Sequence, residues 1–326
     1  MEHLRGEFIE GIKKDFYEYA EENMGYQMQD MVHPEIFEVA TATGANEKHT
    51  VGIGTDLLKE KPEGEKIKYS KVGEGFTVQS TWHTYADGLE FSYENVKDMN
   101  ERKVTNLVAD KARTWVDSYM QGKDQYAANV FNYGGYTAGN TIFNGSSPGD
   151  PDPTGNLCYD GKPFFNLNDN LRPLTPNATG TKYNGLALPL TTENIQTAYD
   201  LFTLTNAVNS RGQKIVNKPD IILYHPSLRW NVQKILETQK EVGTANNTIN
   251  TVYGLLRPVE WRFLDTSTMW CLGKAKKGIK FWDREKLTFD FRRNDETKGY
   301  VADVIARYGI EVNNWRYWVG SNVPTS

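Results

Sequence analysis

The sequence predicts an α+β fold, because its helical and strand-like patterns occupy separate stretches of the chain. The longest helical signal covers residues 93–131, where Val108, Ala112 and Trp115 fall on one apolar stripe. Strand-like alternation comes before this helix, at residues 66–85, and dominates the chain after Trp261. A helix of that length spans a whole domain.

The chain begins with a predicted amphipathic helix. Phe8, Ile12, Phe16 and Tyr19 are spaced four, four and three residues apart, so they form one stripe that needs a partner surface. Residues 39–46 are small and polar and contribute little to a core. We therefore interpret residues 1–45 as an arm that ends in an extended segment.

Residues 66–85 predict a long β-hairpin. Residues 66–72 alternate, residues 73–75 supply a flexible tip, and residues 76–85 continue the strand pattern. Many polar residues lie on both sides of this hairpin. We expect it to reach across a neighbouring molecule, since a hairpin packed on its own core shows one apolar face.

The helix after this hairpin has Ser92 as a plausible cap, and its predicted stripe includes Val104 and Leu107. Residues 144–185 are rich in turn-forming residues and predict a loop. Thr191 opens a further helix with Ile195, Ala198, Tyr199 and Phe202 inward, and Pro226 starts another with Leu228, Val232, Ile235 and Leu236 inward.

The C-terminal third predicts mainly strands. Short ones are expected at residues 261–264, 269–272 and 279–282, followed by a strand pair. That pair consists of residues 287–293 and 299–308, joined around Asn294-Asp-Glu-Thr.

Composition excludes several classes of protein. The chain has 326 residues, a formal charge of -5 and a pI near 5.7, which argues against a protein that binds nucleic acid through a basic surface. Cys158 and Cys271 are too far apart for a metal motif and resemble reduced thiols. No window approaches eighteen consecutive apolar residues, so we expect no membrane association.

No pattern predicts catalysis, a cofactor or a metal. His225 precedes Pro226 and is interpreted as a helix-entry residue rather than a base. Asp150, Asp152 and Asp160 lack the alternation of a calcium loop and are interpreted as solvated carboxylates. We therefore expect no enzymatic activity.

Four fragments carry a resemblance to a known family. They are Asp160-Gly-Lys-Pro-Phe-Phe, Arg211-Gly-Gln-Lys, Pro219-Asp-Ile-Ile-Leu-Tyr-His-Pro-Ser-Leu and Asn246-Asn-Thr-Ile-Asn. Their order, from about residue 35 to the end, resembles the major capsid proteins of tailed phages with the Hong Kong 97 fold. Within that group the chain looks most like the Mu-like prophage major head subunits.

The resemblance implies a division into domains. Residues 1–45 would be the N-terminal arm and residues 46–88 the extended loop that lies over an adjacent subunit. Residues 89–190 and 281–312 would form the peripheral domain around a spine helix at 93–131. Residues 191–280 and 313–326 would form the axial domain.

The resemblance also implies surfaces between subunits. The candidate residues are Phe8, Ile12, Phe16, Tyr19, Lys66, Lys68, Lys71, Phe76, Asn294, Asp295 and Glu296. Some relatives join a loop lysine to an asparagine covalently, but no buried carboxylate suited to that chemistry is evident in this sequence. Exposed lysines that keep a strand edge soluble are the simpler interpretation of Lys66, Lys68 and Lys71.

The function implied is assembly. Copies of the chain would form the hexamers and pentamers of an icosahedral shell around double-stranded DNA, which they touch only weakly. A portal, a scaffold and a decoration protein are the expected partners, with assembly in the host cytoplasm and a final place in the virion. Since the arm begins almost at Met1, we expect either a segment already removed in maturation or a separate scaffold.

Two alternatives stay open. An encapsulin-like compartment would share the shell fold but enclose enzymes. A carbohydrate-binding β-rich protein would use its eight tryptophans as sugar platforms. Because these tryptophans are scattered, we interpret them as core and interface anchors.

Overall fold

The computed structural model describes residues 10–11, 13–21, 31–44, 47–50, 60–67, 69, 75–80, 82–92, 94, 101–135, 158–176, 178–240 and 249–325. Within these ranges the chain forms a four-stranded sheet, a five-stranded sheet and a two-stranded ribbon, with helices packed against both sheets. The predicted α+β class is therefore confirmed.

The first sheet contains, in spatial order, β1 (Glu38–Thr41), β9 (Ile279–Arg293), β10 (Tyr300–Val312) and β4 (His83–Phe91). Strands β9 and β10 are antiparallel partners from Arg293 opposite Tyr300 to Ile279 opposite Val312. This confirms the predicted C-terminal hairpin. It also merges two short predicted strands, residues 279–282 and 287–293, into the single strand β9.

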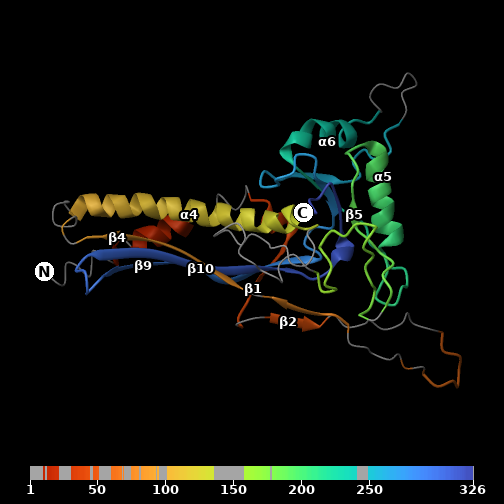
Figure 1. The fold of residues 1–326 in the computed structure, drawn as a ribbon, viewed down its shortest axis with the longest axis horizontal. Helices are drawn as coiled ribbons and strands as arrows, with labels where there is room; N and C mark the ends of the chain where they lie inside the picture. The colour runs from red at the N-terminus through yellow and green to blue at the C-terminus, as the bar shows by residue number, and fades with distance from the viewer. Residues whose placement is uncertain are drawn as a thin grey trace.

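Helix α4 (Glu101–Asn132) runs along one face of the first sheet (Figure 1). Its residues Trp115 and Val116 pack in one apolar cluster with Phe289 and Phe291 of β9. This confirms the long helix, although residues 95–100 lie outside the described residues. Leu107, predicted on the buried stripe, is instead 46% exposed, because it lies off the face that contacts the sheet.

Strand β1 (Glu38–Thr41) is mostly exposed, in agreement with the prediction that this stretch forms little core, but its place in the sheet was not predicted. It pairs in parallel with β9, with Val39 opposite Phe281, and Ala42 just beyond it is buried. The two strands lie far apart in sequence, and small polar residues do not reveal such a distant partner. The segment is extended, as predicted, but it forms an integral strand of the sheet.

The second sheet contains, in spatial order, β5 (Gly185–Leu186), β11 (Trp318–Ser321), β8 (Trp270–Gly273), β6 (Ile221–Tyr224) and β7 (Arg257–Glu260). Its helical elements are α5 (Thr192–Asp200), η1 (Leu201–Thr205), η2 (Pro226–Leu228) and α6 (Arg229–Leu236). Ile195, Phe202, Val232 and Leu236 pack together against this sheet, as their spacing predicts.

Local signals at helix starts are confirmed. The side chain of Thr191 accepts a hydrogen bond from Asn194 N at 3.2 Å and caps α5. The ring of His225 accepts a hydrogen bond from Ser227 N at 3.1 Å and caps η2. His225 is therefore a helix-entry residue.

One predicted strand is wrong. Residues 261–264 form a turn, and β7 ends at Glu260, since Trp261 is fully buried in the core between the elements. At the end of the chain the 3-10 turn η3 (Trp315–Tyr317) leads into β11. Apolar aromatic runs give no clear period, so buried turns and strands look alike.

The predicted hairpin at residues 66–85 is also wrong in its pairing. Strand β3 (Thr77–Ser80) pairs with β2 (Glu47–Thr50), with Glu47 opposite Ser80, and residues 60–67 form no strand. Residues 83–91 belong to β4, which pairs with β10 in the first sheet. Alternation along residues 66–72 and the predicted tip at residues 73–75 favoured a partner close in sequence, whereas β3 pairs with the more distant β2. Residues 68 and 70–74 lie outside the described residues.

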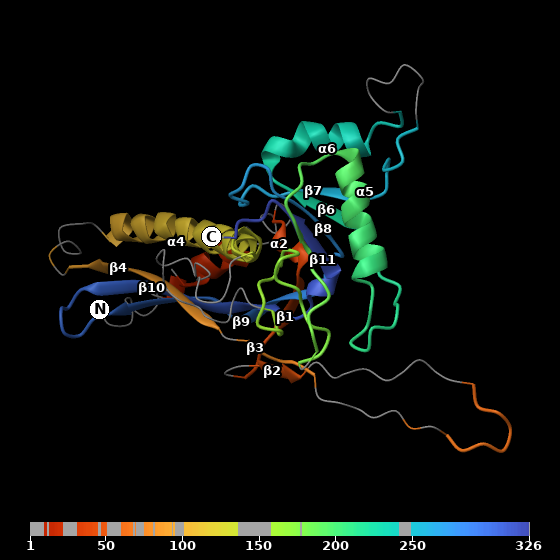
Figure 2. The same ribbon diagram turned by 45° about the vertical axis from the view of Figure 1, so that its right-hand side comes forward.

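Figures 1 and 2 show the arrangement of these parts. Helix α4 and the first sheet form an elongated half, and the second sheet with α5 and α6 lies at one end of it. The ribbon of β2 and β3 lies beside the first sheet, on the side away from α4. Residues 60–67 project beyond both sheets.

Candidate functional site

A buried glutamate fixes the ribbon to the first sheet. Glu311 Oε2 in β10 accepts hydrogen bonds from Ser80 Oγ at 2.6 Å and from Trp282 Nε1 at 2.8 Å. Trp82 meets the ring of Trp282 edge-on, with 5.7 Å between centroids, and its Nε1 donates to the carbonyl of Gly44 at 3.1 Å. Hydrogen bonds to a charged group contribute about 1.5–3 kcal/mol each. These contacts hold the ribbon firmly against the first sheet, so the ribbon is a fixed base for the residues that connect β2 and β3.

The described residues 60–67 and 69, between the two strands of the ribbon, are exposed. We call residues 51–76, which connect β2 and β3, the excursion. Residues 60–67 are all exposed, Ile67 by 61%, and Tyr69 is exposed by 89%. Lys66 lies among them, whereas Lys68 and Lys71 lie outside the described residues. Two large apolar side chains in water at the end of a projecting segment favour a contact with another molecule.

Phe76, at the other end of the excursion, is placed differently. Its ring lies 5.0 Å from the ring of Tyr159 and is half-buried. Phe76 therefore anchors the excursion to its own chain, and its contact with a neighbour stays a prediction.

The N-terminal segment contains a helix at residues 10–11 and 13–21, which we call the arm helix. Phe16 is 2% exposed and stacks on Phe289 with 4.4 Å between ring centroids. The hydroxyl of Tyr17 accepts a hydrogen bond from Phe289 N at 3.3 Å, and Lys13 Nζ lies 2.6 Å from Asp290 Oδ1. The arm helix thus covers β9 beyond the end of β1.

Tyr19 is half-buried in the same contact, with the guanidinium of Arg113 5.3 Å from its ring centroid. Phe8 and Ile12 lie outside the described residues. Phe16 and Tyr19 therefore contact their own chain, as their stripe requires, and their role between subunits stays a prediction.

The turn between β9 and β10 presents the other candidate residues. Asn294 N donates to the carbonyl of Gly299 at 2.9 Å, and Asn294 Oδ1 accepts from Glu296 N at 3.0 Å. Asp295 and Glu296 are exposed at the end of the hairpin. The structure thus places Asn294, Asp295 and Glu296 together on a well-defined turn that is available to a neighbour.

Two buried ion pairs hold the body together. Lys123 Nζ of α4 lies 2.7 Å from Asp283 Oδ1 of β9, and burial lowers the pKa of the Lys123 ammonium although Asp283 opposes the shift. Arg172 and Asp160 form the other pair. The prediction that Asp160 is solvated is wrong, because its side chain is fully buried against Arg172. Asp150 and Asp152 lie outside the described residues.

A buried pair between His33 and Asp124 was not predicted from the sequence. His33 Nδ1 lies 2.9 Å from Asp124 Oδ1, and Asp124 Oδ2 accepts a hydrogen bond from Trp261 Nε1 at 2.7 Å. The neighbouring residues Lys123 and Asp124 both lie on the buried part of α4. The two adjacent charges within this mainly apolar helix segment are the sequence signal by which the network could have been found.

Chemistry at the described thiols is disfavoured. Burial raises the pKa of the Cys158 thiol to about 12, and it also raises the pKa of Cys271. Among the described residues no group of His, Cys, Asp and Glu side chains is arranged to hold a metal ion. In the part of the chain that the structure describes, no helix is long and apolar enough to cross a membrane.

The tryptophans do not form a sugar platform. All eight are described, and only Trp230 is exposed, by 69%, while the others are 9% exposed or less. The contact between Trp82 and Trp282 is edge-on rather than coplanar. Their burial agrees with the interpretation as core anchors.

Comparisons with known proteins agree with this architecture. A family model described as phage capsid protein matches residues 75–321. The chain is similar in structure to Mycobacterium phage Patience, with 11% identity, a TM-score of 0.56 and coverage of 95% of this chain and 88% of that one. It is also similar to the capsid of Ralstonia phage GP4, with 12% identity, a TM-score of 0.51 and coverage of 89% and 90%.

No curated protein sequence matches the chain. The specific resemblance to Mu-like head subunits stays a prediction, since the family model is broader. That model covers well over half of the chain, and both solved structures resemble the chain in fold over most of its length. The chain therefore belongs to the phage capsid protein family and has the Hong Kong 97 fold of tailed-phage major capsid proteins.

Proposed function

We propose that hundreds of copies of this chain close into an icosahedral shell around the double-stranded DNA of a tailed phage. The observation that carries this proposal is the excursion, whose residues 60–67 project from a firm base and expose Ile67 and Tyr69. A protomer that contacts its neighbours through different surfaces on each side is suited to build a closed shell.

The proposal assigns a role to each part of the chain. Residues 1–45 act as the arm and residues 46–88 as the loop that lies over an adjacent subunit. Residues 89–190 and 281–312 form a peripheral domain, and the β9–β10 turn with Asn294 meets neighbours near a threefold position. Residues 191–280 and 313–326 form an axial domain. The separation of the first and second sheets supports these boundaries.

In this proposal the shell assembles in the host cytoplasm with several partners. Hexamers and pentamers of the chain contact each other, a portal ring and a scaffold guide closure, and a decoration protein adds to the finished virion. The net charge of -5 favours weak contact with the packaged DNA, because phosphates are not attracted to an acidic protein. The chain itself is structural and performs no catalysis in this proposal.

Electron microscopy of the purified full chain tests the proposal. We expect uniform icosahedral shells, formed alone or with co-expressed scaffold. A monomer that persists under every assembly condition would contradict it. Shells that contain an enzyme and no nucleic acid would instead support the encapsulin-like alternative.

A further inference from the structure

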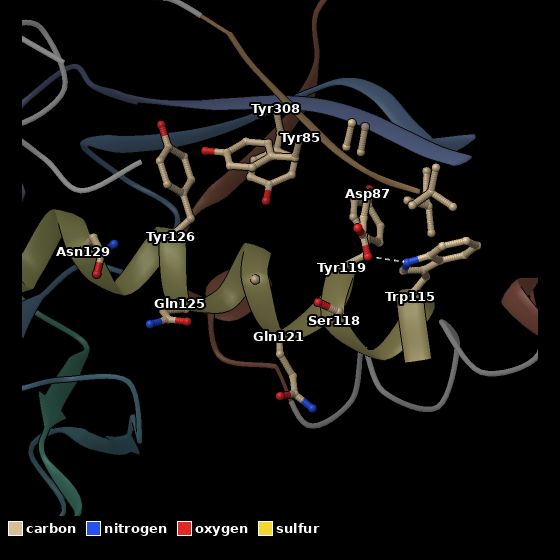
Figure 3. A pocket seen from close by; sticks show the side chains of 15 residues that line it. Tyr85, Asp87, Trp115, Ser118, Tyr119, Gln121, Gln125, Tyr126, Asn129 and Tyr308 are labelled. Carbon is tan, nitrogen blue, oxygen red and sulfur yellow. Dashed lines mark hydrogen bonds between the residues drawn. The ribbon is translucent and has the colours of Figure 1, made fainter. Parts of the chain in front are cut away.

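A cavity of about 380 Å³ lies between α4 and the first sheet, beside β4. Figure 3 shows tyrosine side chains from the helix and from two strands gathered in it. Its aromatic lining consists of Tyr85, Trp115, Tyr119, Tyr126 and Tyr308. Its size lies within the range of about 300–1,000 Å³ typical of ligand sites.

The cavity contains one charged lining residue, Asp87, which is exposed at its edge. Asp87 Oδ2 accepts a hydrogen bond from Trp115 Nε1 at 2.6 Å, and Oδ1 accepts one from Gly88 N at 2.9 Å. These neutral donors orient the carboxylate without neutralising it. Among the described residues no lysine or arginine forms an ion pair with Asp87. A fixed carboxylate beside several aromatic faces attracts a cation.

Further along α4, the ammonium group of Lys123 already lies close to two of these aromatic rings. Lys123 Nζ lies 5.2 Å from the ring centroid of Tyr119 and 5.9 Å from that of Tyr308, and it pairs with Asp283. Tyr119 and Tyr308 also line the cavity. The rings of Tyr119 and Tyr308 thus already contact one ammonium group, that of Lys123. The cavity combines aromatic rings with the carboxylate of Asp87, as the Lys123 site combines them with Asp283.

We propose that the cavity binds the side-chain ammonium of Lys66 from a second copy of the chain. This inference rests on the proposed function, since it needs a neighbouring subunit within reach. Lys66 is exposed on the excursion, and no described residue of its own chain pairs with it. It precedes the exposed Ile67, so one contact buries an apolar side chain and neutralises Asp87.

Lys61 offers a matched comparison on the same excursion. It is also exposed, but it lies between Glu60 and Pro62, before the turn in which Glu65 N donates to the carbonyl of Pro62 at 3.2 Å. Each lysine follows a glutamate, Glu60 before Lys61 and Glu65 before Lys66, so the neighbouring charge does not distinguish them. Of the two, only Lys66 adjoins a large exposed apolar side chain, Ile67. We therefore expect Lys66, and not Lys61, to enter the cavity.

Charge reversal tests the pairing. The variants Asp87→Lys and Lys66→Glu are each expected to lower the fraction of chain assembled into shells about tenfold at fixed concentration, equivalent to ~1.4 kcal/mol. The double variant is expected to return to within about twofold of the wild-type fraction, because the exchanged charges attract again. Combining Asp87→Lys with Lys61→Glu should give no recovery.

Asp87→Lys also removes the hydrogen bond between Asp87 and Trp115, so a second experiment leaves Asp87 unchanged. Ser118 lines the cavity and is exposed, so we expect Lys66→Cys with Ser118→Cys to form disulfide-linked subunits in oxidised shells. Lys61→Cys with Ser118→Cys should stay largely unlinked. The buried thiols Cys158 and Cys271 do not compete.

The inference would be overturned if Asp87→Lys and Lys66→Glu each formed shells as well as the wild type does. It would also be overturned if shells of the Lys66→Cys, Ser118→Cys variant contained no disulfide-linked subunits. Either result would leave the shell function intact. A wild-type chain that never forms shells would overturn both.

Discussion

Arg172 and Asp160 form a two-contact ion pair in which both side chains are fully buried. Arg172 Nε lies 2.8 Å from Asp160 Oδ2, and Nη2 lies 2.8 Å from Oδ1. The third donor, Arg172 Nη1, binds the carbonyl of Phe164 at 2.9 Å. The pair thus ties together a stretch that otherwise has few regular elements.

Removing one partner should be costly. We expect Arg172→Met to lower the free energy of unfolding by about 3–5 kcal/mol, because it leaves Asp160 buried without a counter-charge. Urea unfolding of the unassembled chain measures this change. Arg293→Met, at an exposed position of β9, should change it by less than about 0.5 kcal/mol. Equal effects of the two substitutions would contradict a structural role for the pair.

The base of the excursion should depend on Ser80. We expect Ser80→Ala to weaken the attachment of the ribbon by about 1–3 kcal/mol, since Glu311 loses a hydrogen bond in a buried place. Limited proteolysis within residues 60–80 should then become faster. Thr84→Ala, on an exposed position of the neighbouring strand, serves as the control and should leave the cleavage rate unchanged.

The arm helix should detach without unfolding the body. We expect Phe16→Ala to remove the stack on Phe289 and to raise amide exchange throughout residues 10–21, while exchange in α4 stays slow. Tyr17→Phe removes only the hydroxyl contact with Phe289 and should have a smaller effect. If exchange in α4 rises equally with Phe16→Ala, the arm helix is part of the same cooperative unit.

Stability should fall at alkaline pH. Burial raises the pKa of Cys158 from an ordinary 9.0 to about 12 and the pKa of Tyr159 from 10.0 to about 12. Because the unfolded chain loses these protons first, their contribution is complete below about pH 9 and declines up to about pH 12. Each group adds a slope of about 1.4 kcal/mol per pH unit in that window.

Urea unfolding between pH 8 and pH 11 measures this slope. Cys158→Ala should reduce the slope by the contribution of one titrating group, about 1.4 kcal/mol per pH unit, whatever it does to stability at pH 8. An identical slope in this variant would show that Cys158 does not titrate with unfolding.

Elements with local signals were predictable from the sequence. The cap at Thr191, the Pro226 helix start and the alternation on both sides of Asn294 each lie within a few residues of the element they define. The long stripe of α4 was equally clear, apart from Leu107. In these cases neighbouring residues alone determine the structure.

Contacts between distant segments were not predictable. The pairing of β1 with β9 and of β2 with β3 depends on edges that only the folded chain creates. The burial of Asp160 depends on Arg172, which lies within the same turn-rich stretch that predicts a solvated loop. Of the candidate surfaces, the sequence located the exposed Lys66 and the Asn294 turn, but it did not reveal the cavity beside Asp87.

The most direct test of subunit contact through the excursion is amide hydrogen exchange at residues 60–67, compared between the free chain and assembled shells. In the free chain these amides should exchange rapidly, because the residues are exposed and form no strand. In shells we predict strong protection of this stretch, since the excursion lies over an adjacent subunit. Equal, rapid exchange in both states would contradict the view that the excursion joins neighbouring subunits.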